Sequence, residues 1–137
     1  MNDYLAPALD HAAILAVSAA GLAHVGDAVL ELMVRTWLCE HGKATNHGLH
    51  RAAVQYVSAT AQAAAMERLL PCLSEEEQQL YHRGRNAHTH AAPKGATPGQ
   101  YARATGMETL FGGLYLAGRR ERVNELFALM MEAQDAV

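Results

Sequence analysis

The sequence predicts an all-α fold, and three observations support this prediction. Alanine is abundant and β-branched residues are few, which favours helix. Helix-start and helix-stop residues recur along the chain at helical distances. No run of alternating apolar and polar residues is long enough to predict a strand. We therefore expect about five or six helices in one domain that spans residues 1–137.

Composition and charge narrow the class of protein. Half of the residues are hydrophobic and 18% are charged, which is typical of a globular chain. Cys39 and Cys72 form no metal-ligand pattern, and they suit a reducing compartment. The first apolar run, residues 12–20, lacks a basic segment before it and is too short to span a bilayer. We expect a cytoplasmic protein without a membrane partner. The net charge of −3 argues against a domain that coats nucleic acid through its overall charge, but allows a local basic strip.

Two long helical segments are expected in the first half of the chain. Ser18 can cap a helix that runs to about His41, where Gly42 ends it. Asn46 or His47 opens the next segment, which Pro71 stops. The expected apolar face of the first helix consists of Leu22, Val25, Val29, Leu32, Met33 and Thr36, and Gly26 and Asp27 lie off it. The expected stripe of the second consists of Val54, Val57, Ala61, Ala64, Ala65 and Leu69.

Three further helices are expected in the second half. Ser74 and Glu77 form a capping box, and so do Thr97 and Gln100, with Pro98 at the first helical position. The second of these helices should run to Ala117. The last should run from about Arg120 to Ala133, with its apolar face formed by Val123, Leu126, Phe127, Met130 and Met131.

Asp27 is an acidic residue without an evident partner. Glu31 lies four residues before Arg35, an order that favours an ion pair on a helix. The residues four positions after and four positions before Asp27 are Glu31 and Ala23, and neither can neutralise the charge of Asp27. An exposed, solvated aspartate is common, so Asp27 taken alone favours that simple interpretation.

Glu108 lies at the edge of an expected core stripe formed by Met107, Leu110, Phe111 and Leu114. Its helical neighbours Ala104, Thr105 and Gly112 are small. Either another helix packs close to it, or a ligand needs room there. Two isolated carboxylates, Asp27 and Glu108, suit a hard cation such as Mg²⁺, which takes further ligands from water and phosphate. The equally weighted alternative is a buried salt bridge from Glu108 to Arg83 or Arg103.

A basic segment lies around the end of the third expected helix, which Ser74 begins, and the loop after it. Arg83, Arg85, Asn86 and Lys94 can form a phosphate-binding strip, since arginine offers forked donors and lysine a point charge. The alternative is an ordinary helix end, with basic residues that complement the helix dipole, followed by a loop. The loop histidines are a weak signal for zinc because no further ligand stands at a recognised spacing.

Four segments of the chain resemble a known family. "GLAHVGDAVLELMVR" resembles the signature helix of the ribonuclease III catalytic domain, and "RATGMETLFGGLYLAG" its second acidic helix. "LHRAAVQYVSATAQA" and "RGRNAHTHAAPKGATPGQYARATGMETL" resemble, more narrowly, the Mini-III ribonucleases, which lack the double-stranded RNA-binding domain. The resemblance covers about residues 21–127, and the four segments in this order are far more specific than any one of them.

The resemblance implies a homodimeric, ribonuclease III-like helical fold and a Mg²⁺-dependent endoribonuclease, with Mn²⁺ able to substitute. Its expected substrate is double-stranded RNA, namely the base-paired ends of the 23S ribosomal RNA precursor, with a ribosomal protein as a possible helper. Asp27 and Glu108 map to the catalytic, metal-binding acids. RNA contacts are expected from Arg83, Arg85, Asn86, Lys94 and Arg103. The alternative is a non-catalytic helical domain that binds RNA or associates with the ribosome.

The chain departs from full-length ribonuclease III at three positions. That family has further acids where this chain has Ala20, Ala23 and Thr105, and the Mini-III pattern lacks them too. With fewer carboxylates, more of the metal's ligands must be water or RNA phosphate, so we expect weak affinity for free metal.

Overall fold

The computed structural model describes residues 2–43, 45–87 and 95–135, and every regular element among them is helical. The elements are α1 (His11–Ala16), α2 (Ala19–Glu40), α3 (Asn46–Val57), α4 (Ala59–Leu69), a 3₁₀ turn η1 (Leu70–Cys72), α5 (Glu75–Arg85), α6 (Pro98–Leu116) and α7 (Arg120–Asp135). The predicted all-α fold is confirmed. No helix in these ranges is long and apolar enough to cross a membrane.

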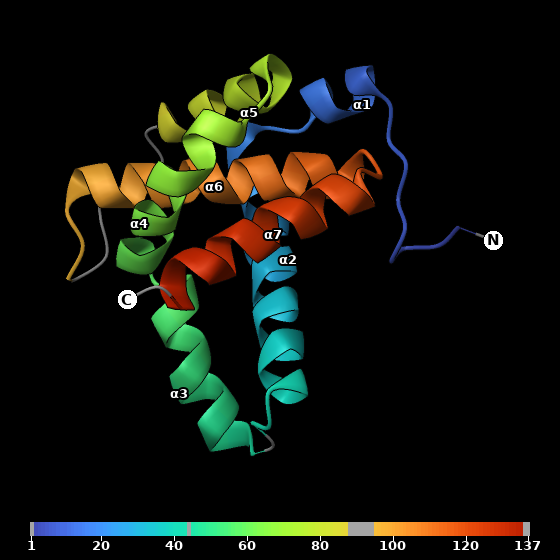
Figure 1. Ribbon diagram of the computed structural model, residues 1–137. Coiled ribbons are helices and arrows are strands. Elements are labelled where there is room, and N and C mark those ends of the chain that lie inside the picture. The colour runs from blue at the N-terminus through green and yellow to red at the C-terminus, as the bar shows by residue number, and fades with distance from the viewer. Residues whose placement is uncertain (1, 44, 88–94, 136–137) are drawn as a thin grey trace.

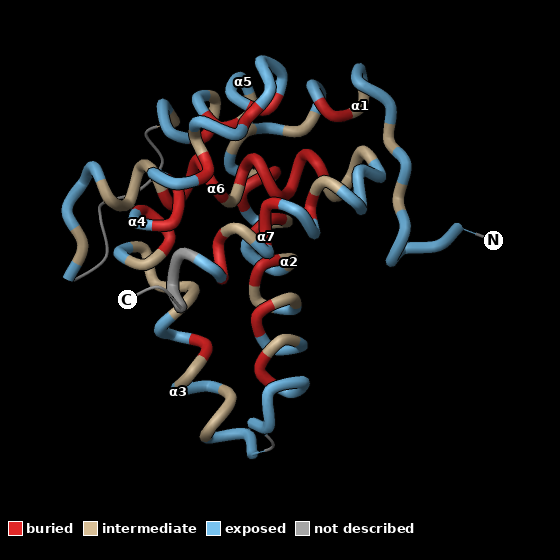
Figure 2. The backbone as a smooth tube through the Cα atoms, viewed as in Figure 1, coloured by how far each residue is buried: buried red, intermediate tan, exposed pale blue. Residues whose placement is uncertain are grey.

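Helix α6 lies at the centre of the fold. Helices α2, α4 and α5 pack against it, and α7 packs against α4 and α6 (Figure 1). Most residues in its middle are buried, whereas the lower halves of α2 and α3 extend away from it as a hairpin (Figure 2). The predicted core residues of α6 and α7 are all buried: Met107, Leu110, Phe111, Leu114, Val123, Leu126, Phe127, Met130 and Met131.

Glycines allow α2 and α6 to touch through their backbones. A Cβ atom placed on Gly26 would lie 1.7 Å from the carbonyl oxygen of Glu108, and one on Gly112 would lie 2.0 Å from that of Leu22. No side chain fits in either place, because these distances are far below van der Waals contact. The expectation that Gly26 lies off the core face is therefore wrong: Gly26 is buried at the crossing. The helix tolerates this glycine because the close approach of α6 requires it.

The core face of α2 also differs from the predicted one. Its buried residues are Leu22, Ala23, Gly26, Leu30, Val34 and Leu38. Of the predicted face only Leu22 is buried, and Leu32 is 60% exposed. Hydrophobicity alone selects the wrong face, since α6 packs on the side where Ala and Gly permit close contact.

The segment expected as one helix up to Pro71 consists of two. Ser58 ends α3 through a hydrogen bond from its N–H to the Val54 carbonyl, and its hydroxyl accepts from the N–H of Ala61 to begin α4. The change of direction breaks the predicted stripe, so Val54 is 48% exposed and Ala64 is also exposed. Helix α1 was not predicted, although Asp10 caps it in the ordinary way through the N–H of Ala13.

The predicted helix caps are confirmed. Ser18 begins α2, and both capping boxes form, Ser74 with Glu77 and Thr97 with Gln100. Glu77 has a second function, because its buried carboxylate accepts two hydrogen bonds from Arg122 at 2.7 and 2.9 Å. Those bonds hold the pKa of Glu77 below its usual value despite burial. This ion pair fastens the start of α5 to α7.

Candidate active site

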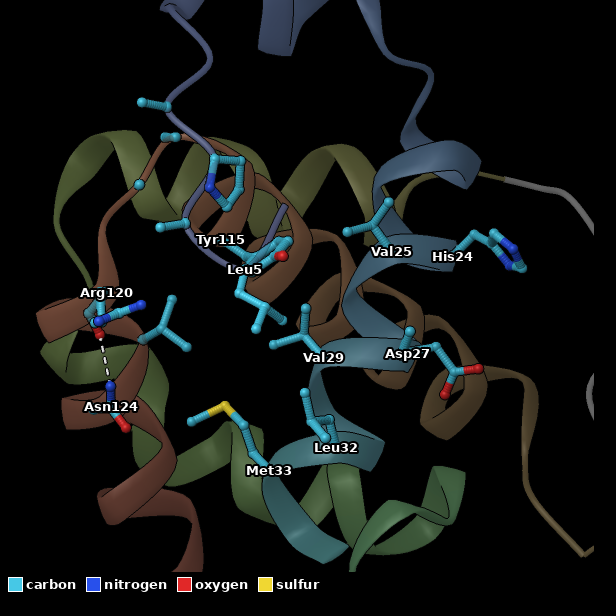
Figure 3. Close-up of a pocket in the computed structure, with 17 residues that line it drawn as sticks. Leu5, His24, Val25, Asp27, Val29, Leu32, Met33, Tyr115, Arg120 and Asn124 are labelled. Atoms are coloured by element: carbon cyan, nitrogen blue, oxygen red, sulfur yellow. Dashed lines mark hydrogen bonds between the residues drawn. The ribbon is translucent and has the colours of Figure 1, made fainter. Parts of the chain in front are cut away.

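The crossing of α2 and α6 places Asp27 beside Glu108. Gly26, the residue before Asp27, lies against the backbone of Glu108, so the two carboxyl-bearing side chains leave the same crossing point. Asp27 is exposed and Glu108 is half-buried. Figure 3 shows Asp27 and His24 projecting to one side of α2, away from Val25 and Val29. Residues that are 81 positions apart in sequence thus form one site.

Glu108 has an unusual acidity. Burial is the first cause that raises its pKa to about 8, followed by the charge of Asp27 and a hydrogen bond with the Asp27 side chain. At neutral pH the metal-free protein therefore keeps a proton on Glu108, between the two carboxyl groups. A perturbed acid beside a second carboxylate is a frequent mark of a functional site.

The salt-bridge alternative for Glu108 is wrong in this structure. Arg103 pairs instead with Glu67, with its Nη1 atom 3.3 Å from Oε1. Arg83 donates from Nη2 to the carbonyl of Val17, at the end of α1. By contrast, the predicted ion pair of Glu31 with Arg35 forms at 3.1 Å, and this pair gives Glu31 a structural partner that Asp27 lacks.

The donor set fits a hard divalent cation. Carboxylate oxygens are suitable ligands, and the proton held by Glu108 marks a place where positive charge is needed. No group of three or more His, Cys, Asp or Glu residues in the described ranges could hold a metal. Of the three positions that lack the acids of full-length ribonuclease III, Ala23 and Thr105 are buried, and Thr105 donates to the Tyr101 carbonyl. Water and phosphate must supply the other ligands.

Two of the predicted RNA-binding arginines come together. Burial raises the pKa of Tyr81, and the charges of Arg85 and Arg103, with a hydrogen bond to Arg85, oppose this rise, so both arginines lie near the Tyr81 hydroxyl. Arg85 is exposed, as is Asn86 at the end of α5. Arg83 is turned toward α1, and its Nη1 is buried without a hydrogen-bond partner among the described residues. Lys94 and the loop histidines His88 and His90 lie outside the described residues.

A groove runs along α2 from His24 and Asp27 to the face that carries Val25, Val29 and Leu32, and sequence reasoning missed it. It has a volume of about 830 Å³, and Val25, Val29 and Leu32 of α2 face Leu5 of the N-terminal segment across it (Figure 3). The hydroxyl of Tyr115 donates to the carbonyl of Tyr4 and holds this segment in place. Val25, Val29, Leu32 and Met33, which were expected in the core, line this groove.

Comparisons with known proteins agree with this geometry. The family model "Ribonuclease III domain" matches residues 20–119. A Mini-ribonuclease 3 of Symbiobacterium thermophilum is 52% identical over 77% of this chain and 81% of its own length. A Mini-ribonuclease 3 of Thermoanaerobacter is 40% identical over 87% of this chain and 84% of its own length. A crystal structure of a Fusobacterium nucleatum protein superposes with a TM-score of 0.78 at 26% identity, over 88% of this chain and 97% of that one.

Both acids lie inside the matched region, and the helices that carry them form its centre. Enzymes of this family generally depend on a divalent metal. From its fold, its site and its relatives, the chain belongs to the ribonuclease III family, in the Mini-ribonuclease 3 group.

Proposed function

We propose that this endoribonuclease of double-stranded RNA matures the base-paired ends of the 23S ribosomal RNA precursor in the cytoplasm, with Mg²⁺ held by Asp27 and Glu108. The observation that carries the proposal is the pairing of these carboxyl groups at the crossing of α2 and α6, with the pKa of Glu108 raised to about 8. A pair of acids that shares a proton is prepared to exchange it for a cation. Mn²⁺ has the same ligand preference and should substitute.

The residues of the chain have separate tasks in this mechanism. Asp27 offers an exposed carboxylate, and Glu108 would release its proton to solvent when a cation binds, which would turn a proton-sharing pair into a joint anionic site. Mg²⁺ bound there would activate water for in-line attack on phosphorus and stabilise the leaving 3′-oxygen. Arg85, Asn86 and Arg103 bind phosphates of the duplex beside the site. We assign the same role to Lys94 and a weaker one to Arg83, whose guanidinium is engaged with Val17.

Weak general attraction to RNA makes a helper useful. With a net charge of −3, few cations are available for phosphates, and phosphate contacts supply most non-specific affinity. We propose that a ribosomal protein bound to the precursor presents the duplex to the enzyme. This arrangement directs cleavage to ribosomal RNA without extensive reading of base sequence.

The test of the proposed substrate uses the terminal stem of the 23S precursor as a duplex RNA. We expect cleavage at fixed positions in both strands with Mg²⁺, and none with EDTA. With the ribosomal protein present in both reactions, a duplex of equal length and unrelated sequence should be cut more slowly than the stem. Cleavage that persists in EDTA would refute the metal site, and equal rates on the two duplexes would refute the ribosomal substrate alone.

We propose that the groove beside α2 is the surface at which two copies of the chain form a homodimer. An exposed apolar surface of this kind marks an interaction site, and residues of α2, α7 and the N-terminal segment line it together. A two-fold dimer would carry one site for each strand of a duplex, as cleavage of both strands requires.

Leu32→Glu should separate the dimer into monomers, because it places a charge in the apolar contact. Light scattering should give twice the 14.8 kDa chain mass for the wild type and a single chain for the variant. Leu15→Glu is the matched control, since Leu15 is 56% exposed but lies on α1, outside the groove. A wild-type protein that is monomeric at micromolar concentration would contradict the dimer.

A further inference from the structure

His24 lies beside Asp27 on the same side of α2. Residues three positions apart on a helix are surface neighbours, and these two are about 4.5 Å apart along the helix axis. Both side chains are exposed, and both line the groove beside α2. Figure 3 shows the imidazole and the carboxylate pointing in the same direction from α2. A large molecule that reaches Asp27 therefore also meets His24.

The surface of α2 around His24 is low. Its other neighbours at three and four positions are Ala20, Gly21 and Ala28, and the two alanines are exposed. These small residues leave room for a duplex to lie on α2 next to Asp27. Full-length ribonuclease III has an acid where Ala20 stands, so this side of His24 also lacks a carboxylate that would repel a polyanion.

The imidazole of His24 is available to a ligand. It forms no hydrogen bond or ion pair with any residue in the ranges that the structure describes. Arg35, a basic residue further along the same helix, is by contrast engaged with Glu31 at 3.1 Å. An imidazole carries at least one N–H donor in either protonation state. His24 thus offers a free donor less than one helical turn from Asp27.

A backbone phosphate of the duplex fits this donor best. Phosphate oxygens are charged, strong acceptors on the outside of the duplex, and most contacts to nucleic acids go to them and to the sugars. Mg²⁺ prefers oxygen ligands, so the cation site of Asp27 and Glu108 does not need the imidazole. That site takes the reacting phosphate, which leaves a neighbouring phosphate for His24. The offset of about 4.5 Å along α2 is comparable with the rise of about 3.4 Å per nucleotide of one strand.

We propose that His24 binds a backbone phosphate of the RNA one or two nucleotides from the cleaved bond and so positions the strand at the cation site. The inference rests on the proposed function, because it requires a duplex at Asp27 and Glu108. The contact exists in the bound substrate as well as in the transition state, so its main effect is on KM. It gives α2 a phosphate contact of its own, in addition to those proposed for α5 and α6.

The test combines His24→Ala with RNA duplexes that carry one uncharged methylphosphonate linkage at successive positions. For the wild type, one linkage beside the cleaved bond should lower kcat/KM about 5- to 10-fold, the effect of one lost hydrogen bond. His24→Ala should lose a similar factor on unmodified RNA, mainly in KM, and nothing more on the duplex modified at that linkage. His24→Gln should recover part of the loss, because its amide N–H also donates.

His11→Ala is the matched control, since His11 is exposed on α1 and lies outside the groove. It should keep the wild-type kinetics on every duplex. Both alanine variants should keep the wild-type melting temperature and the wild-type mass in light scattering, because neither side chain is buried.

Three results would overturn the inference. His24→Ala could equal the wild type on unmodified RNA, or it could lose activity and yet keep the full penalty at every modified linkage. It could also change the mass of the protein in solution, which would assign His24 to the contact between copies of the chain. A wild-type enzyme that cleaves no RNA duplex would instead refute the proposed function, so the two failures are distinguishable.

Discussion

Asp27→Asn should reduce kcat/KM on double-stranded RNA by at least about 10³-fold, or roughly 4 kcal/mol of the activation barrier. The change keeps the size of the side chain but removes one of only two carboxylates at the site, and the described residues offer no third acid to replace it. The cation would then be held by Glu108 alone, whose proton competes with it. The measurement is a single-turnover cleavage assay on a duplex RNA with Mg²⁺ in excess.

Glu31→Gln is the matched control for Asp27→Asn, since it removes an acid one turn further along the same helix. Glu31 pairs with Arg35 at 3.1 Å, and losing this surface pair should change activity less than about twofold. Asp27→Asn should also lower the pKa of Glu108, because the charge and the hydrogen bond of Asp27 both help to raise it. Full cleavage by Asp27→Asn would falsify the site assignment.

The local signal marks Asp27 and Glu108 as candidates but leaves alternatives open, and only the family resemblance assigns them a catalytic role. Asp27 lacked a neighbour of opposite charge, and Glu108 stood among small residues. The structure adds the reason for the small residues: of the two explanations considered, the close packing of another helix is the one observed. Gly112 admits the backbone of α2, and Ala104 is buried.

The orientation of α2 could not be predicted, because it depends on which helix packs against it. Periodicity ranks residues by hydrophobicity, so it placed Leu32 in the core and Gly26 outside. The real contact is decided by backbone approach at Gly26, and Leu32 remains exposed beside the groove. Long-range contacts escape sequence reasoning for the same reason. The bond from Arg83 to Val17 joins residues that are 66 positions apart, and it diverts a guanidinium from the surface where the motif placed it.

Glu108→Gln should abolish cleavage and yet stabilise the metal-free protein at high pH. The folded state raises the pKa of Glu108 from 4.5 to about 8, so it binds this proton more tightly than the unfolded chain does. The resulting stabilisation is complete below about pH 4.5 and is lost as the pH rises through 8. Glutamine cannot ionise, so the variant escapes the loss. Each pKa unit is worth about 1.4 kcal/mol, which makes the expected advantage a few kcal/mol at pH 9.

Chemical denaturation at pH 5, 7 and 9, without metal, measures this effect. The stability of Glu108→Gln relative to the wild type should increase with pH, whereas Glu132→Gln, at an exposed position of α7, should show no such trend. Adding Mg²⁺ at pH 9 should stabilise the wild type and leave Glu108→Gln unchanged, since the cation takes the place of the lost proton. A variant that is less stable than the wild type at pH 9 would show that Glu108 is held by a favourable partner, which contradicts a metal site. An acid that weakens the fold when ionised and is required for cleavage is explained by ligand binding, because packing alone would favour a neutral residue there.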